Sequence, residues 1–168
     1  LLLGVATSHW DWLVAGGYNA AANINGQNGF DNSMWRQAIT GQDQLRQRVG
    51  NALLSLLVVG IDGLNTNWRA FAAGNYVDVL MDNAFGNYRD ILDKVTTSPA
   101  MGYYLTYLGN RKANAATGAQ PDENYARELM QLFTLGVSKL DADGTVQTSG
   151  GNAIDAYTQD DVSGLARV

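Results

Sequence analysis

The stretch QDQLRQRVGNALLSLLVV, residues 42–59, carries the clearest helical pattern in the chain. Its apolar residues recur at helical spacing along one side: Leu45, Val49, Ala52, Leu53, Leu56 and Leu57. Leu54 and Val58 make the other side of its second half apolar as well. A helix that is apolar on all sides is normally buried, so we expect this helix at the centre of the fold. We expect Thr40 with Asp43 to cap its start and Gly60 to end it.

Helical spacing continues on both sides of this stretch. Before it, Asp31 or Asn32 is expected to cap a short helix that runs to Ile39. After it, the pattern predicts helices over residues 65–73, 76–85, 88–97, 100–108, 122–135 and 159–168. These elements indicate that most of the chain is helical.

Several of these helices have recognisable start signals. Asn87 is a good cap for the helix over 88–97, and Ser98-Pro99 places a cap residue before a proline at the first helical position. Thr158 with Asp161 forms a capping pair before the last helix. Residues 139–157 contain Asp-Ala-Asp-Gly and a Gly- and Ser-rich run, which favours a turn. The sequence therefore predicts a mainly α fold, an irregular bundle of about six to eight helices with one small β-hairpin near 139–157.

The pattern divides the chain at about residue 30. Residues 1–30 are a poorly patterned N-terminal segment, although a helical turn over 8–13 would carry Trp10 and Trp12. Residues 31–168 form the expected helical domain. Because the last helix is still amphipathic at Val168, we expect the domain to continue beyond both ends in the full-length protein.

Composition excludes several classes of protein. The chain has 168 residues, 46% of them hydrophobic, which is enough to bury a core. Its net charge is −5, and its longest basic cluster is Arg111-Lys112, so we exclude nucleic acid as a partner and disfavour an anionic membrane surface. It has no cysteine, which removes disulfides, thiolate metal sites and a cysteine nucleophile. The longest apolar run, residues 52–59, is too short to be a transmembrane segment.

Few residues point to specific chemistry. His9 is the single histidine, with Ser8 beside it and no nucleophile elbow in the chain, so a Ser-His-Asp triad is disfavoured and a histidine-rich metal site is excluded. We expect no cofactor. Asp141, Asp143 and Thr145 form a weak calcium candidate, but an ordinary Asp-Gly turn is the preferred interpretation.

Residues 122–135 are the most informative segment for function. Glu123 and Arg127 form an i, i+4 pair, and the simplest interpretation is a solvated helix with one ion pair. The alternative is a polar cluster with the preceding loop, made of Asn110, Arg111, Lys112, Asn124, Arg127 and Glu128. If this cluster were catalytic, Glu128 and Arg111 would line one concave pocket. A closed buried bridge between Glu128 and an arginine would make it structural.

Five ordered blocks then resemble a known family. They are residues 44–49 (QLRQRV), 83–90 (NAFGNYRD), 98–101 with 108–112 (SPAM and LGNRK), 123–136 (ENYARELMQLFTLG) and 157–162 (YTQDDV). The blocks resemble the bacterial family of proteins of unknown function numbered eighteen hundred, over about residues 35–168, whereas the first 34 residues show no such resemblance. The resemblance implies the central part of a longer bacterial protein that is often exported, hence periplasmic or extracellular. It implies no catalytic residues.

Two functions remain open at this point. The first is a non-catalytic binding or assembly module of an exported protein, with a protein or a glycan as its partner. The chain's Trp, Tyr, Asn and Gln side chains suit sugar stacking and polar contacts, although they also suit an ordinary core. The second is a hydrolase that acts on an extracellular polymer such as a polysaccharide. Its paired carboxylates would come from this set: Asp78, Asp82, Asp90, Asp93, Glu123 and Glu128.

Overall fold

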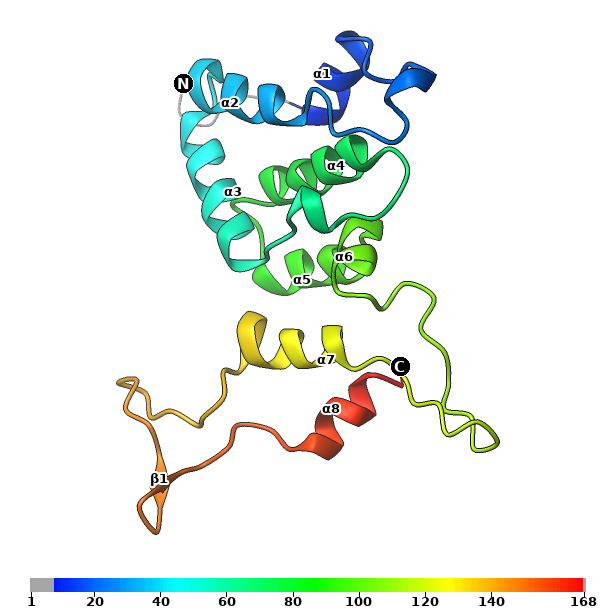
Figure 1. The fold of residues 1–168 in the computed structure, drawn as a ribbon. Helices are drawn as coiled ribbons and strands as arrows, with labels where there is room; N and C mark the ends of the chain where they lie inside the picture. Colours follow the sequence, from blue (N-terminus) through cyan, green and yellow to red (C-terminus); the bar gives the residue numbers. More distant parts are fainter. Residues whose placement is uncertain (1–7, 168) are drawn as a thin grey trace. The chain divides into compact units, whose positions relative to one another are not determined.

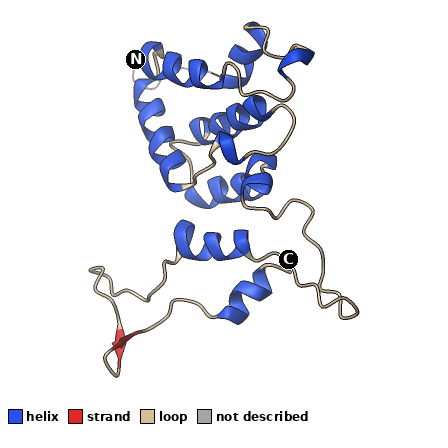
Figure 2. Cartoon of the chain, in the orientation of Figure 1, coloured by secondary structure: helices blue, strands red, loops and turns tan. Residues whose placement is uncertain are grey.

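The computed structural model describes residues 8–167 as two compact units, which divide between Tyr104 and Leu105 (Figure 1). The N-terminal unit is mainly helical, whereas the C-terminal unit consists mostly of loops around a few short helical segments and a small hairpin (Figure 2). Together, the described residues form eight α-helices and one two-stranded sheet. The predicted fold class, mainly α with a small hairpin, is therefore confirmed. Over the described residues, no helix combines the length and the apolar character needed to cross a bilayer.

The N-terminal unit is built around the helix α4 (Arg69–Asp82). The other elements of this unit are α1 (His9–Ala15), η1 (Ala21–Asn23), α2 (Phe30–Thr40), α3 (Gln44–Leu56), η2 (Ile61–Gly63), α5 (Tyr88–Thr96) and α6 (Pro99–Tyr104). All five of the other α-helices of this unit contact α4. It buries Phe71, Tyr76, Val77, Leu80 and Met81, and this apolar surface is the main stabilising contribution to the unit.

The prediction that the 42–59 stretch forms the central helix is wrong. The helix is there, as α3, but it lies at the edge of the unit, with Leu45 and Leu56 exposed. Its buried positions are Gln47 and Gly50, so the apolar stripe is turned largely away from α4. The expected Thr40 cap is also absent, because Asp43 is the N-cap residue.

A second difference is that α4 is one helix, not the two helices expected over 65–73 and 76–85. Gly74 and Asn75, where we expected the break, lie inside it. Gly74 is buried because α1 packs against it: a Cβ atom there would lie 3.2 Å from Leu13 Cδ1. The glycine is therefore required for close helix packing rather than for a turn.

The helix α2 has an inverted distribution of side chains. Its buried residues are the polar Ser33 and Gln37, whereas Trp35 and Ile39 are 70% and 74% exposed. A surface helix normally shows the opposite arrangement. The interior beside α2 is consequently polar.

The C-terminal unit contains α7 (Asn124–Glu128), the π-helical segment η3 (Leu129–Thr134), β1 (Thr148–Ser149), β2 (Asn152–Ala153) and α8 (Gln159–Leu165). We expected one α-helix over 122–135, but its second half is a π-helix, in which the Thr134 hydroxyl donates to the Leu129 carbonyl at 2.6 Å. Because each π turn takes up one more residue, the expected apolar stripe is broken, and Leu132 is 55% exposed.

The start signals of three helices are confirmed. Asn87 caps α5 by accepting a hydrogen bond from the Arg89 backbone N–H, and α6 begins at Pro99. Thr158 and Asp161 form a full capping box at α8. Within the hairpin, Gly150 and Gly151 both have positive φ, as a two-residue turn between antiparallel strands requires.

Candidate functional site

The N-terminal unit contains a cavity of about 500 Å³ with mainly apolar walls. Its lining comes from α1, α4, α6 and the two loops before α2 and α4: Trp10, Val14, Asn19, Thr66, Asn67, Trp68, Phe71, Ala72, Asn75, Pro99, Ala100 and Tyr103. We call it the aromatic pocket. Its volume is within the range of sites that bind small ligands.

Three aromatic rings on one wall of the pocket are packed edge to face. The Phe71 ring centroid lies 4.9 Å from that of Trp10 and 5.9 Å from that of Trp68, with interplanar angles of 76° and 83°. Phe71 is buried, whereas Trp10 is 44% exposed. The rings therefore stabilise one another, and part of the Trp10 surface is left accessible.

Trp68 is held in an unusual backbone conformation. Its φ of 57° and ψ of 33° are left-handed, which is uncommon for a bulky residue that is not glycine. Its backbone N–H donates to the Ile24 carbonyl at 2.6 Å, and its own carbonyl accepts from Phe71 and Ala72 at the start of α4. Such strain costs roughly 1–3 kcal/mol and is typical of functional sites. Here it places the indole on the pocket wall.

Polar groups of the pocket lie at its rim. The side chains of Asn19, Asn67 and Asn75 are exposed and form no hydrogen bond with any of the residues described. Thr66 adds a hydroxyl group. Since the lining includes no Asp, Glu, His, Lys or Arg, the pocket offers aromatic faces and neutral hydrogen-bonding groups.

The start of α1 is attached to α4 through Asp78. Its Oδ1 accepts from the His9 backbone N–H at 2.6 Å, and its Oδ2 accepts from the Trp10 backbone N–H at 2.9 Å and from Ser8 Oγ at 3.3 Å. Burial raises the pKa of Asp78 to about 6, although these hydrogen bonds act in the opposite direction.

His9 is buried, as are the polar residues Ser33, Gln37, Asp43 and Gln47. Ser33 Oγ lies 2.9 Å from His9 Nδ1 and itself donates to the Phe30 carbonyl at 2.8 Å, so we infer that Nδ1 carries the proton. Burial lowers the pKa of His9 to about 4, although the charge of Asp43 acts in the opposite direction. Ser33 and His9 are both fully buried, and the Ser33 hydroxyl contacts the Phe30 carbonyl and the imidazole.

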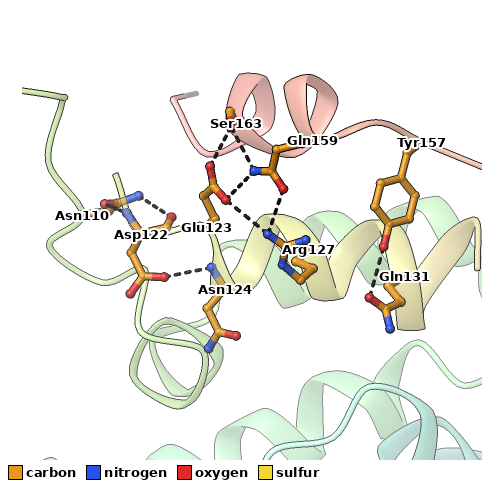
Figure 3. Close-up of polar contacts among 9 residues, drawn as sticks. All are labelled: Asn110, Asp122, Glu123, Asn124, Arg127, Gln131, Tyr157, Gln159 and Ser163. Atoms are coloured by element: carbon orange, nitrogen blue, oxygen red, sulfur yellow. Dashed lines mark hydrogen bonds and ion pairs between the residues drawn. The ribbon is translucent and has the colours of Figure 1, made fainter. Parts of the chain in front are cut away.

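The candidate polar residues of the C-terminal unit form two separate groups, shown in Figure 3. In the first, which we call the Glu123 clasp, Glu123 Oε1 accepts from Ser163 Oγ at 2.6 Å. Glu123 Oε2 accepts from Gln159 Nε2 at 2.8 Å and from Arg127 at 3.2 Å. The hydrogen bond from Ser163, the one from Gln159 and the charge of Arg127 keep the pKa of Glu123 below its usual value. The clasp ties α7 to α8 and occupies both carboxylate oxygens.

The second group surrounds Asn110 in the loop before α7. Its side chain donates to the carbonyls of Asp122 and Ala166, at 3.1 and 3.3 Å, and accepts from the Asp122 backbone N–H at 2.8 Å. The Asn124 N–H in turn donates to Asp122 Oδ1 at 2.8 Å. Asn110 thus closes the loop and fixes the start of α7.

The remaining members of the predicted cluster are not in either group. Arg111 and Lys112 lie in an exposed loop. Glu128 Oε2 has no hydrogen-bond partner within residues 8–167, where the ion pair of this segment joins Arg127 to Glu123. The structure therefore separates the six predicted residues, and the partners that complete the clasp, Gln159 and Ser163, were not predicted.

The weak calcium candidate forms an ordinary turn. Thr145 N–H donates to Asp143 Oδ1 at 2.9 Å, and Gln147 Nε2 donates to Asp141 Oδ1 at 2.8 Å. Gly144 has the positive φ that the turn requires. In residues 8–167, three or more Asp, Glu or His side chains nowhere converge on a possible metal position.

Comparison with known proteins identifies the family. The model of the family described as protein of unknown function DUF1800 matches residues 10–168. The chain belongs to this family. The match begins at Trp10, so the likeness to DUF1800 extends further than the predicted residues 35–168 and includes Trp10 and Trp68. No curated protein and no solved structure matches the chain.

The aromatic pocket of this DUF1800 chain was not predicted as a site. Its residues come from three separate parts of the sequence, within 10–19, 66–75 and 99–103, so no local motif marks them. The Trp, Tyr, Asn and Gln side chains suggested stacking on sugars but did not indicate where. The helix expected over 100–108 ends at Tyr104 as α6, so Tyr103 and Tyr107 are not on one helix.

Proposed function

We propose that this chain is a non-catalytic binding module, that the aromatic pocket is its ligand site, and that the ligand is an uncharged carbohydrate. The observation that carries the proposal is the pairing of exposed aromatic surface with free amides in one cavity. We further propose, from the family resemblance, that the module belongs to an exported protein and acts in the periplasm or outside the cell.

The chemistry of the lining favours a neutral sugar. A pyranose ring has an apolar face of C–H groups that packs on an indole or phenol ring, and the exposed surface of Trp10 and Tyr103 offers such faces. The ring's hydroxyl groups, which project around its edge, need donors and acceptors. The amides of Asn67 and Asn75 provide both at the rim. Without a charged group in the lining, an acidic sugar gains no ion pair, and the net charge of −5 repels it.

The hydrolase alternative has less support. A glycosidase needs two carboxyl groups at the scissile bond, and the lining of the aromatic pocket supplies none. In the C-terminal unit, Glu123 has both oxygens in hydrogen bonds and a lowered pKa, whereas a general acid needs a raised one. Asp78 has a raised pKa, but its two oxygens bind the start of α1.

Calorimetric titration with a panel of oligosaccharides tests the proposal. The panel contains neutral gluco-, manno- and N-acetylglucosamine oligomers and, as acidic members, oligogalacturonates. We expect at least one neutral oligomer to bind and the acidic ones to bind more weakly. Trp10→Ala should weaken binding about tenfold, the equivalent of about 1.4 kcal/mol.

Trp35→Ala is the matched control, because Trp35 is 70% exposed on α2 and does not line the pocket. It should bind as the unchanged chain does. Circular dichroism establishes that both variants are folded. If no neutral oligomer binds, or if the two variants weaken binding equally, the carbohydrate site is not the aromatic pocket.

A further inference from the structure

The carboxylate of Asp78 determines where Trp10 lies. Three hydrogen bonds, from the backbone of His9 and Trp10 and from Ser8 Oγ, converge on its two oxygens. Hydrogen bonds to an ionised acceptor are stronger than those between neutral groups. Asp78 also lies on α4, the helix that supplies Phe71 and Asn75 to the pocket. One helix therefore carries both part of the pocket wall and the anchor of Trp10.

We propose that Asp78 is a positioning residue for the aromatic pocket, whose ionised carboxylate holds Trp10 against Phe71 and thereby sets the affinity for the ligand. The effect on affinity rests on the proposed function. The effect on Trp10 does not, because it follows from the hydrogen bonds alone.

Because Asp78 must be ionised to hold Trp10 in this way, the position of Trp10 should depend on pH. Burial brings its pKa to about 6, and the neighbouring charge of Asp82, one turn along α4, acts in the same direction. When the carboxylate takes up a proton, it loses its charge and becomes a weaker acceptor for the three donors of Ser8, His9 and Trp10. Trp10 should consequently be held less firmly below about pH 6.

Other charged groups near Asp78 do not account for a change at this pH. The imidazole of His9 on α1 stays neutral until about pH 4. Asp11 is in the exposed first turn of α1. Arg46 of α3 donates to the Met81 carbonyl at 2.8 Å, near the C-terminal end of α4.

Fluorine NMR of the chain labelled with 5-fluorotryptophan tests the proposal without any ligand. The spectra of Trp10→Phe and Trp35→Phe assign the two resonances of interest. We expect the Trp10 resonance to move between about pH 8 and pH 5 with a midpoint near 6. In Asp78→Asn, the resonance should stay near the acid position of the unchanged chain at every pH.

Two internal controls accompany this measurement. The Trp35 resonance should not move, and Asp82→Asn should lower the midpoint slightly without abolishing the titration, because Asp82 acts on Asp78 only through its charge. A Trp10 resonance that is constant over this range, or that titrates unchanged in Asp78→Asn, would overturn the positioning role.

The second arm repeats the calorimetric titration with the best neutral oligomer at pH 7.5 and pH 5. Affinity should fall about tenfold on acidification in the unchanged chain and should not depend on pH in Asp78→Asn. Equal pH dependence in both proteins would contradict the link to affinity. If no oligomer binds at either pH, the carbohydrate proposal fails, while the fluorine titration still decides whether Asp78 positions Trp10.

Discussion

His9 Nδ1 lies 2.9 Å from Ser33 Oγ in the interior of the N-terminal unit, where neither side chain is exposed to solvent. The backbone N–H of the same histidine donates to Asp78. His9 thus contributes an imidazole whose pKa is lowered, and through its backbone it is bound to the Asp78 carboxyl, whose pKa is raised. Their pKa values of about 4 and about 6 imply opposite effects of pH on stability within one packed unit.

Asp78→Asn should reveal the contribution of His9. Below its unfolded pKa of 6.5 the imidazole takes up a proton in the unfolded chain, but in the folded chain it does so only near pH 4. The folded state therefore loses stability as the pH falls from 6.5 to 4, by roughly 3 kcal/mol. With Asp78 removed, urea unfolding of the N-terminal unit should show stability that rises steadily with pH over this window. A flat profile in this variant would contradict the assignment.

His9→Gln should reveal the opposite contribution, that of Asp78. The folded state binds this proton below about pH 6 and the unfolded state only below 3.8, so stability falls by roughly 3 kcal/mol as the pH rises through this window. In the chain with both groups, the two slopes nearly cancel. Tryptophan fluorescence is a suitable probe, because all four tryptophans lie in the N-terminal unit. Parallel pH profiles for the two variants would rule out the opposed pair.

The sequence predicts the helices of this fold better than their burial. The apolar stripe of residues 42–59 predicted a central helix. The helix is present as α3, but the helix at the centre of the unit is α4. Spacing along the chain reports which residues share a face, whereas the depth of that face depends on partners distant in sequence. Gly74 is a second example. In the sequence, a glycine that allows two helices to pack closely cannot be distinguished from one that ends a helix, and only the contact with Leu13 shows which it is.

For polar contacts, too, the sequence predicts pairs that are close along the chain but not pairs that are far apart. The pairing of Glu123 with Arg127 follows from their i, i+4 spacing and is confirmed at 3.2 Å. Ser163 lies forty positions from Glu123, and no spacing rule links them. The aromatic pocket depends on contacts of the same kind, since Trp10 and Phe71 meet only because α1 packs on α4. What the sequence does not reveal is therefore mostly the long-range contact.

Gly50→Ala should destabilise the N-terminal unit. Gly50 is buried in α3, and a Cβ atom there would collide with Met81 Sδ on α4, so the two helices must move apart or Met81 must repack. Overpacking of this kind typically costs about 1–3 kcal/mol, more than the gain of about 0.5–1 kcal/mol from replacing a helical glycine. Urea unfolding followed by tryptophan fluorescence measures the difference.

Gly164→Ala in α8 is the matched control for this change. It is a helical glycine with open space where the Cβ atom would lie, so the substitution should stabilise the helix by about 0.5–1 kcal/mol. Hydrogen exchange of the α8 amides reports it. If alanine stabilises at both positions, the contact between α3 and α4 at Gly50 is looser than the structure indicates.

Glu123→Gln should release α8 without affecting the N-terminal unit. The carboxylate accepts hydrogen bonds from Ser163, Gln159 and Arg127. An amide in its place has one acceptor oxygen and an NH2 group that donates but does not accept hydrogen bonds. The backbone amides of α8 should therefore exchange hydrogen faster in the variant than in the unchanged chain, and the exchange rates of the α4 amides should be the same in both. Asp160→Asn is the matched control, because it removes an exposed carboxylate from the first turn of α8 outside the clasp.

Acid should have the same effect as the substitution. Because the pKa of Glu123 is lowered in the folded chain, its contribution to stability is complete above its ordinary value of 4.5 and is lost as the pH falls through the lowered pKa. Exchange in α8, corrected for the intrinsic effect of pH, should accelerate over this range in the unchanged chain. It should accelerate less in Glu123→Gln, where the Thr158–Asp161 capping box, whose carboxyl also has a lowered pKa, is the remaining acid-sensitive contact. Equal acceleration in the two proteins would mean that the capping box and the buried Val162 hold α8, rather than the clasp.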